Sequence, residues 1–81
     1  MTWFWFIQPV PLSMLIDYSG GTAAVYIGET YIGNGALTTL PVWRIKKLTY
    51  DGNGNVLTQL FSPAANTFGD IWSNRAGLIY S

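Results

Sequence analysis

A chain of 81 residues with a formal net charge of zero, no cysteine and no histidine is long enough for one domain only. The lack of cysteine excludes a disulfide scaffold, and with histidine also absent a zinc site would need carboxylates alone, so no metal and no cofactor are expected. Because only 10% of the residues are charged, a free monomer would tend to associate in water.

Residues 1–13 are expected to form an extended hydrophobic arm ahead of a single small domain at 14–81. The arm has no charged residue and contains an unbroken run of large apolar side chains: Trp3, Phe4, Trp5, Phe6 and Ile7. It is too short and too interrupted for a membrane span, and it lacks the basic start and the cleavage site of a signal peptide. Pro9 and Pro11 oppose a helix and favour extended backbone.

Side chains in an extended arm alternate between two sides, so this arm is apolar on both and must be buried on both. Burial within its own domain and burial between neighbouring subunits both meet that condition. We favour the second, because an exchanged arm is easily spared from a small core. The run Trp3–Ile7 is therefore the predicted subunit interface.

Glycine-rich turns divide the rest of the chain into strand-length runs, which predicts an all-β fold, a small sandwich or barrel of hairpins. One hairpin is expected to pair 14–18 with 22–31. A second is expected to pair 43–50 with 56–61 across the turn D-G-N-G-N, whose residues tolerate positive φ. Alternation in 43–50 breaks near Lys46 and Lys47, which predicts a bulge or a bend there.

One short helix is predicted near the C-terminal end, where four residues recur at helical spacing: Phe68, Ile71, Trp72 and Arg75. Thr67 is its expected cap and Gly77 its expected end, and 78–80 should follow as a last strand.

The core is expected to contain Trp43 and Trp72, since each is in phase with aliphatic neighbours. Arg75 is expected to lie over the ring of Trp72 or Phe68.

The pattern V-W-R-I-K-K-L-T-Y-D-G-N-G-N-V at 42–56, followed by F-G-D-I-W-S-N-R-A-G-L-I-Y at 68–80, resembles a group of short, mostly uncharacterised virion accessory proteins of tailed bacteriophages. The segment 25–30 matches in part an upstream Y-I-G element of that group. The likeness covers about the last two thirds of the chain, and the sequence departs from it at 62–65 and in the aromatic arm. The resemblance implies localisation in the virion, on the head or the tail.

The predicted function is a structural subunit of a virion, either a head decoration or cement protein or a tail, adaptor or fibre-associated protein. Its expected partners are copies of itself and other virion proteins. The alternative is a receptor- or glycan-binding module of the tail, because tyrosine rings stack on sugars; the candidate contacts are Tyr18, Tyr31 and Tyr50.

Other function classes are not expected. Without histidine or cysteine an enzyme would lack the usual bases and nucleophiles, and Asp51 and Asp70 have structural explanations in a turn and in the first turn of the helix, so no catalytic residue is predicted. Nucleic acid is not an expected partner, because the main cluster of cations, Arg44, Lys46 and Lys47, is explained as the solvent side of a strand.

Overall fold

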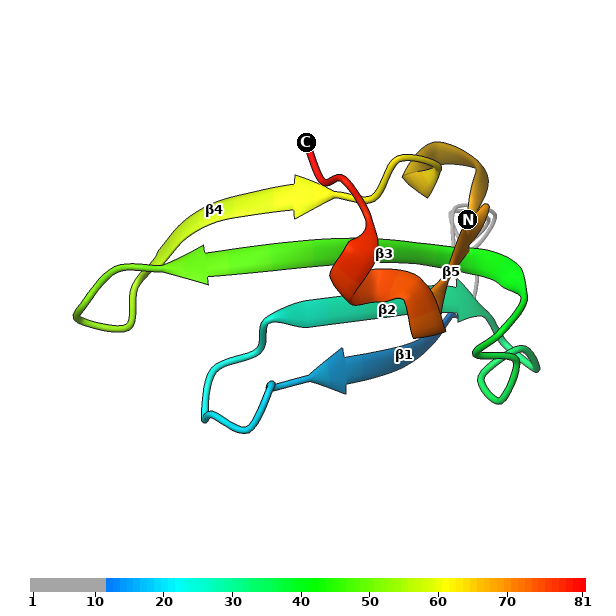
Figure 1. The fold of residues 1–81 in the computed structure, drawn as a ribbon. Coiled ribbons are helices and arrows are strands. Elements are labelled where there is room, and N and C mark those ends of the chain that lie inside the picture. The colour runs from blue at the N-terminus through cyan, green and yellow to red at the C-terminus, as the bar shows by residue number, and fades with distance from the viewer. Residues whose placement is uncertain (1–11) are drawn as a thin grey trace, which may run out of the picture.

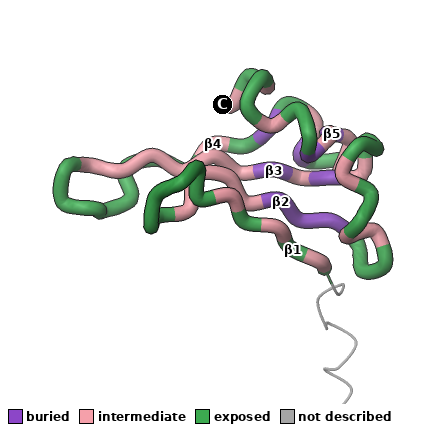
Figure 2. Tube along the Cα trace, turned by 60° about the horizontal axis from the view of Figure 1, so that its bottom comes forward, coloured by how far each residue is buried: buried purple, intermediate pink, exposed green. Residues whose placement is uncertain are grey.

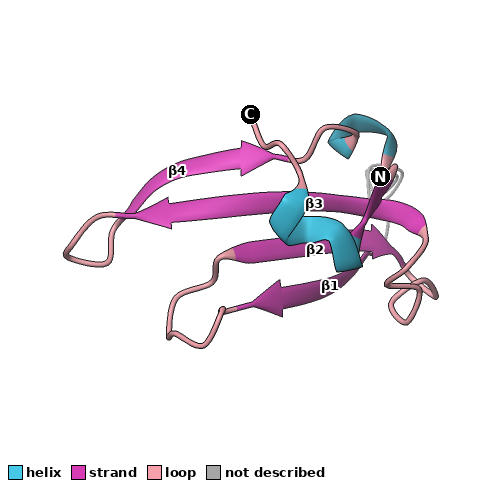
Figure 3. Ribbon diagram, in the orientation of Figure 1, coloured by secondary structure: helices cyan, strands magenta, loops and turns pink. Residues whose placement is uncertain are grey.

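The computed structural model describes residues 12–81, which form one five-stranded antiparallel sheet (Figure 1). Four strands lie side by side in chain order: β1 (Leu12–Asp17), β2 (Tyr26–Tyr31), β3 (Pro41–Tyr50) and β4 (Val56–Phe61). The short strand β5 (Asp70–Ile71) pairs with the beginning of β3. The 3-10 helices η2 (Ala65–Thr67) and η3 (Trp72–Gly77) complete the described part (Figure 3).

The all-β prediction is confirmed, and the strands form one sheet rather than a sandwich or a barrel. Within residues 12–81 no strand remains to form a second sheet. One face of the sheet is instead covered by η3 and the residues that follow it. The predicted arm lies outside the described residues, except that Leu12 and Ser13 already belong to β1.

Both predicted hairpins are present. In the first, β2 begins at Tyr26 rather than at 22, because Ser19 and Gly20 adopt positive φ and the chain bends through the residues that follow. In the second, the carboxylate of Asp51 accepts hydrogen bonds from the backbone N–H groups of Asn53 (2.8 Å) and Asn55 (2.9 Å), as expected of an Asp-led turn.

The predicted irregularity in β3 lies elsewhere. Lys46 and Lys47 pair in regular register with β2 and β4, and the register shifts between Thr49 and Tyr50. The apparent break in alternation arises because Leu48 points to the face opposite the core, as its place in the register shows.

The core lies between the sheet and η3, where Trp43 and Ile45 of β3 meet Trp72, and Figure 2 shows buried stretches in β2 and β3. Trp43 and Ile45 have no exposed surface and Trp72 is 7% exposed, so the prediction that both tryptophans pack in the core is confirmed. Their ring centroids lie 5.7 Å apart at a tilt of 38°. The Trp43 indole N–H donates to the carbonyl of Leu37 (2.9 Å), which satisfies its buried donor.

The predicted C-terminal helix is a 3-10 helix that begins at Trp72. It ends at Gly77, as predicted. It does not extend back to Thr67, because Phe68 has a left-handed φ of 53° and Asp70–Ile71 pair with β3. The Thr67 hydroxyl donates to Ala64 and caps no helix.

Residues 78–80 do not form the expected strand. Only Ser81 pairs with Phe61, through two backbone hydrogen bonds of 3.0 and 3.1 Å. The segment instead packs as a cover for the core, with Leu78 and Tyr80 against the buried cluster.

Candidate interaction surface

One face of the sheet is turned away from Trp43, Ile45 and Trp72 and is here named the open face. Its members follow from strand alternation and from the register of the four long strands. They are Leu12, Met14 and Ile16 of β1; Ile27, Glu29 and Tyr31 of β2; Arg44, Lys46 and Leu48 of β3; and Gln59 and Phe61 of β4.

Strand β1 gives the open face an apolar edge. Its burial alternates, and the apolar residues Leu12 (37% exposed), Met14 (53%) and Ile16 (44%) occupy the exposed positions. Half-covered antiparallel strands ordinarily turn their polar residues outward, whereas the outward positions of β1 are all apolar and its inward side has Leu15 between Ser13 and Asp17. The register places Tyr31 beside Leu12 and Ile27 beside Ile16, which extends the apolar surface onto β2.

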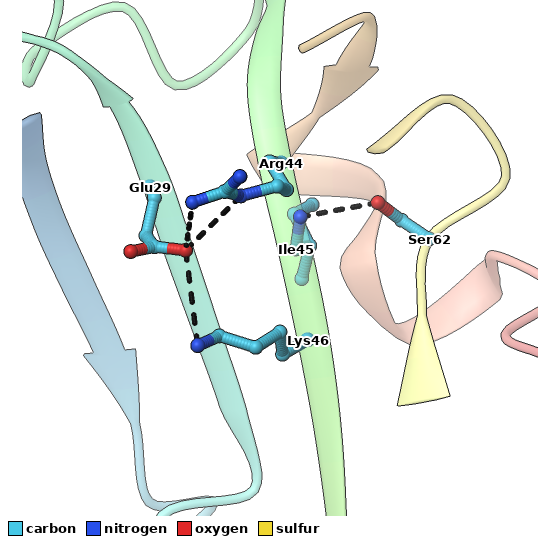
Figure 4. A network of polar contacts seen from close by, with 5 residues as sticks. All are labelled: Glu29, Arg44, Ile45, Lys46 and Ser62. Carbon is cyan, nitrogen blue, oxygen red and sulfur yellow. Dashed lines mark hydrogen bonds and ion pairs between the residues drawn. The ribbon is translucent and has the colours of Figure 1, made fainter. Parts of the chain in front are cut away.

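The centre of the open face carries a charged network (Figure 4). Oε1 of Glu29 accepts hydrogen bonds from Nε (3.1 Å) and Nη2 (2.9 Å) of Arg44, and Nζ of Lys46 lies 3.8 Å from the same oxygen. Glu29 is only 9% exposed, so its charge is balanced within the domain. One acid between two bases leaves this centre with a positive excess.

An aromatic corner adjoins the network. The guanidinium of Arg44 lies 4.8 Å from the ring centroid of Phe68, and Phe68 stacks on Tyr31 with centroids 4.8 Å apart. Tyr31 is still 46% exposed, so the corner has aromatic surface available for contact.

A shallow hollow of about 490 Å³ lies beside Arg44, between Phe61 and Asn66. Arg44 bonds to Glu29, and the Ser62 hydroxyl accepts from the backbone N–H of Ile45 (3.1 Å; Figure 4). Two of the three polar residues that line the hollow, Arg44 and Ser62, are therefore engaged inside the domain, which leaves few groups to converge on a small molecule.

The structure separates the predicted glycan contacts. Tyr18 is 46% exposed and follows β1, and Tyr50 lies at the same end of the sheet, where its hydroxyl donates to the carbonyl of Ala24 (2.6 Å). Tyr31 lies at the opposite end of β2, so the three rings do not form one platform. The predicted arm residues Trp3, Phe4, Trp5, Phe6 and Ile7 lie outside the described residues.

All four acids of the chain have internal partners. Arg75 donates from Nε to Asp17 (2.8 Å) and, helped by the Ser19 N–H, lowers the pKa of that carboxyl. The pKa of Asp51 is lowered by the N–H groups of its turn, chiefly that of Asn55. Asp70 lies in β5 rather than in a helix, and its carboxylate accepts from the N–H of Ala64 (3.0 Å).

The cations are also explained inside the domain. Arg44 and Lys46 border Glu29. The prediction that all three cations share the solvent side of the strand is wrong for Lys47, which alternation places on the core side, 6.0 Å from the ring centroid of Tyr80. Arg75 lies 4.6 Å from the ring centroid of Trp72, which confirms the predicted stacking.

Sequence reasoning did not foresee the Glu29 network or the apolar edge of β1. The signal for the network was present in the opposite charges of two neighbouring strands, but it needed the register between the two hairpins, which the sequence does not supply.

Across residues 12–81 no group of three or more acidic, histidine or cysteine side chains is placed to hold a metal ion. The same part of the chain contains no helix with the length and apolar character needed to cross a membrane. Comparisons of the protein with family models, with curated proteins and with solved structures find no match.

Proposed function

We propose that this protein is a non-catalytic structural subunit that is built into a larger assembly through its open face. The observation that carries the proposal is the placement of Leu12, Met14 and Ile16, which β1 turns to solvent while the core lies on the other side. Complete burial of such side chains is worth about 1.5 to 3 kcal/mol each, and only part of this is realised in the isolated domain. A partner that covers the β1 edge supplies the remainder.

The small core supports the same proposal. Among residues 12–81 the buried hydrophobic cluster consists of Trp43, Ile45 and Trp72, and single cores of domains this size supply about 3 to 5 kcal/mol. With no cysteine for a disulfide, burial against a partner is the available source of extra stability.

The resemblance to virion accessory proteins of tailed phages suggests the setting. In this proposal the protein belongs to the virion, as a decoration or cement protein of the head or as a tail, adaptor or fibre-associated protein. It contacts copies of itself and other virion proteins, and neither nucleic acid nor a membrane span is part of the proposal.

The alternative functions have less support. An enzyme would need free acid and base groups in a cleft, whereas the four carboxylates are held in turns, strand contacts and ion pairs. A glycan module would need neighbouring exposed rings, whereas Tyr31 lies far along β2 from Tyr18 and Tyr50.

The test is the association state of the full chain and of two matched variants. Met14→Lys places a charge on the open face, and Ile79→Lys makes the same kind of change at a residue that is 80% exposed near the C-terminal end. Light scattering after size exclusion should show an oligomer for the wild type and for Ile79→Lys and a monomer for Met14→Lys. A wild-type chain that stays a folded monomer at high micromolar concentration would refute the proposal, and so would an oligomer unaffected by Met14→Lys.

A further inference from the structure

We infer that the open face is covered by the aromatic segment Trp3–Ile7 of a second copy of this chain. The inference rests on the proposed function and adds to it the identity of the partner and of the contacting segment. Three features of the chain support it: the chemistry of the segment, its length, and the sequence that joins it to β1.

The chemistry of the segment matches the face it would cover. Trp3–Ile7 contains no charged side chain, its only polar side-chain groups are the two indole N–H donors, and the β1 edge offers Leu12, Met14 and Ile16 for apolar contact. At the centre of the face, Arg44 and Lys46 both contact the carboxylate of Glu29. An uncharged segment can therefore cover them without supplying an acidic residue of its own. Its remaining positive excess favours the electron-rich face of an indole.

The length of the segment also fits. Five extended residues span about 16 Å at roughly 3.3 Å each. The distance across the open face from β1 to β4 comprises three strand spacings of about 4.8 Å, or roughly 14 Å. The run of aromatic residues can therefore reach from the apolar edge, across the network, to Phe61 on β4.

The residues between the segment and β1 favour a neighbouring copy over the same chain. Leu12, the first residue of β1, pairs with Tyr31, the last residue of β2. To lie over its own open face the chain would have to reverse direction within Gln8, Pro9, Val10 and Pro11. Each proline fixes its own φ and biases the residue before it to extended backbone, so this sequence disfavours such a reversal.

Because the natural chain contains no cysteine, engineered thiols test the inference directly. Full-length Trp5→Cys and full-length Met14→Cys chains, distinguished by mass, are mixed and mildly oxidised. We expect a mixed disulfide dimer whose yield is at least tenfold that of a Trp5→Cys and Ile79→Cys mixture. Near-ultraviolet circular dichroism of each variant checks that the tryptophan core is folded, and Trp3→Cys replaces Trp5→Cys if that variant does not fold.

A chain that carries both Trp5→Cys and Met14→Cys distinguishes a contact between two copies from a contact within one chain. An internal disulfide in a monomer at low micromolar concentration, without mixed dimers, would overturn the inference in favour of the same chain. The absence of any cross-link above the Ile79→Cys background in folded variants would also overturn it.

Failure of this inference can be told apart from failure of the proposed function. The full-length double variant Trp3→Ser with Trp5→Ser should weaken association at least tenfold, as Met14→Lys does. If Met14→Lys dissociates the oligomer and the double variant does not, the open face is still an interface but another segment covers it. If neither variant changes the association state, both proposals fail.

Discussion

Gly28 of β2 lies directly beneath the indole of Trp72. A Cβ atom at residue 28 would fall 2.6 Å from Cζ3 of Trp72, closer than such atoms can approach, and 3.1 Å from Cε3 of Trp43, a contact so tight that this ring would also have to shift slightly. The helix η3 can therefore pack on the sheet only because this position lacks a side chain. Both tryptophans of the small core depend on the same empty volume.

Gly28→Ala should destabilise the domain by about 1 to 3 kcal/mol, because overpacking a filled core forces side chains and backbone to shift. That is a large share of the roughly 3 to 5 kcal/mol that a core of this size supplies. Urea unfolding followed by tryptophan fluorescence measures the loss. Gly52→Ala is the matched control, since a Cβ there meets no atom within 4 Å and its φ is not positive; equal effects of the two changes would show that η3 does not dock as described.

Glu29→Gln should cost about 1 to 3 kcal/mol of unfolding free energy, because it weakens two charge-assisted hydrogen bonds from Arg44 and the ion pair with Lys46. Urea unfolding of Glu29→Gln, Arg44→Gln and the double variant gives the coupling between the two residues. A coupling near zero would mean that the network behaves as an exposed surface pair.

The hairpin around Asp51 could be predicted because its determinants are local. The carboxylate of Asp51 bonds to N–H groups two and four residues onward, and Gly54 takes the positive φ of 85° that the turn requires. The burial of Trp43 together with Ile45 follows in the same way from the alternation of a strand.

The core face of β1 and β2 could not be predicted, because β1 has more apolar residues on its exposed side (Leu12, Met14 and Ile16) than on the side that packs against the core (Leu15). The face that packs contributes Gly28, whose role is the space it leaves for Trp72, and a count of apolar residues does not register space. The start of η3 was missed for a related reason. Local spacing suggested a helix from Phe68, whereas pairing of Asp70–Ile71 with the distant strand β3 prevails.

The ion pair between Asp17 and Arg75 makes part of the free energy of unfolding depend on pH in the acid range. Arg75 lowers the pKa of Asp17 below its ordinary value of 3.8, so the folded state binds the proton less tightly than the unfolded state. The stabilisation from this ion pair is complete above pH 3.8, the ordinary pKa of the carboxyl, and is lost as the pH falls through the lower pKa of the folded state. We expect Asp17→Asn to be less stable than the wild type at pH 7 and the difference to shrink as the pH falls below 3.8.

Urea unfolding at a series of pH values from 7 to 2 checks this expectation. Asp51 has a lowered pKa as well, but it is present in both proteins, so the difference between them reports on Asp17. Arg75→Gln should remove the same part of the acid dependence. A difference between wild type and Asp17→Asn that stays constant down to pH 2 would contradict the assigned ion pair.

Tyr80 should make the domain lose stability in alkali. Burial raises the pKa of its hydroxyl to about 12, and that hydroxyl donates to the carbonyl of Arg75 (2.8 Å) at the end of η3. Because the folded state holds the proton more tightly, the stabilisation from the Tyr80 hydroxyl is present below pH 10, its ordinary pKa, and falls as the pH rises from there towards 12.

Tyr80→Phe keeps the ring packing, removes the hydrogen bond at a cost of about 1 kcal/mol at pH 7, and should be less sensitive to pH in this range. The unfolding free energy of both proteins, measured between pH 8 and 11.5, should therefore converge as the pH rises. Curves that remain parallel would mean that the Tyr80 hydroxyl is not held against Arg75 in the folded protein.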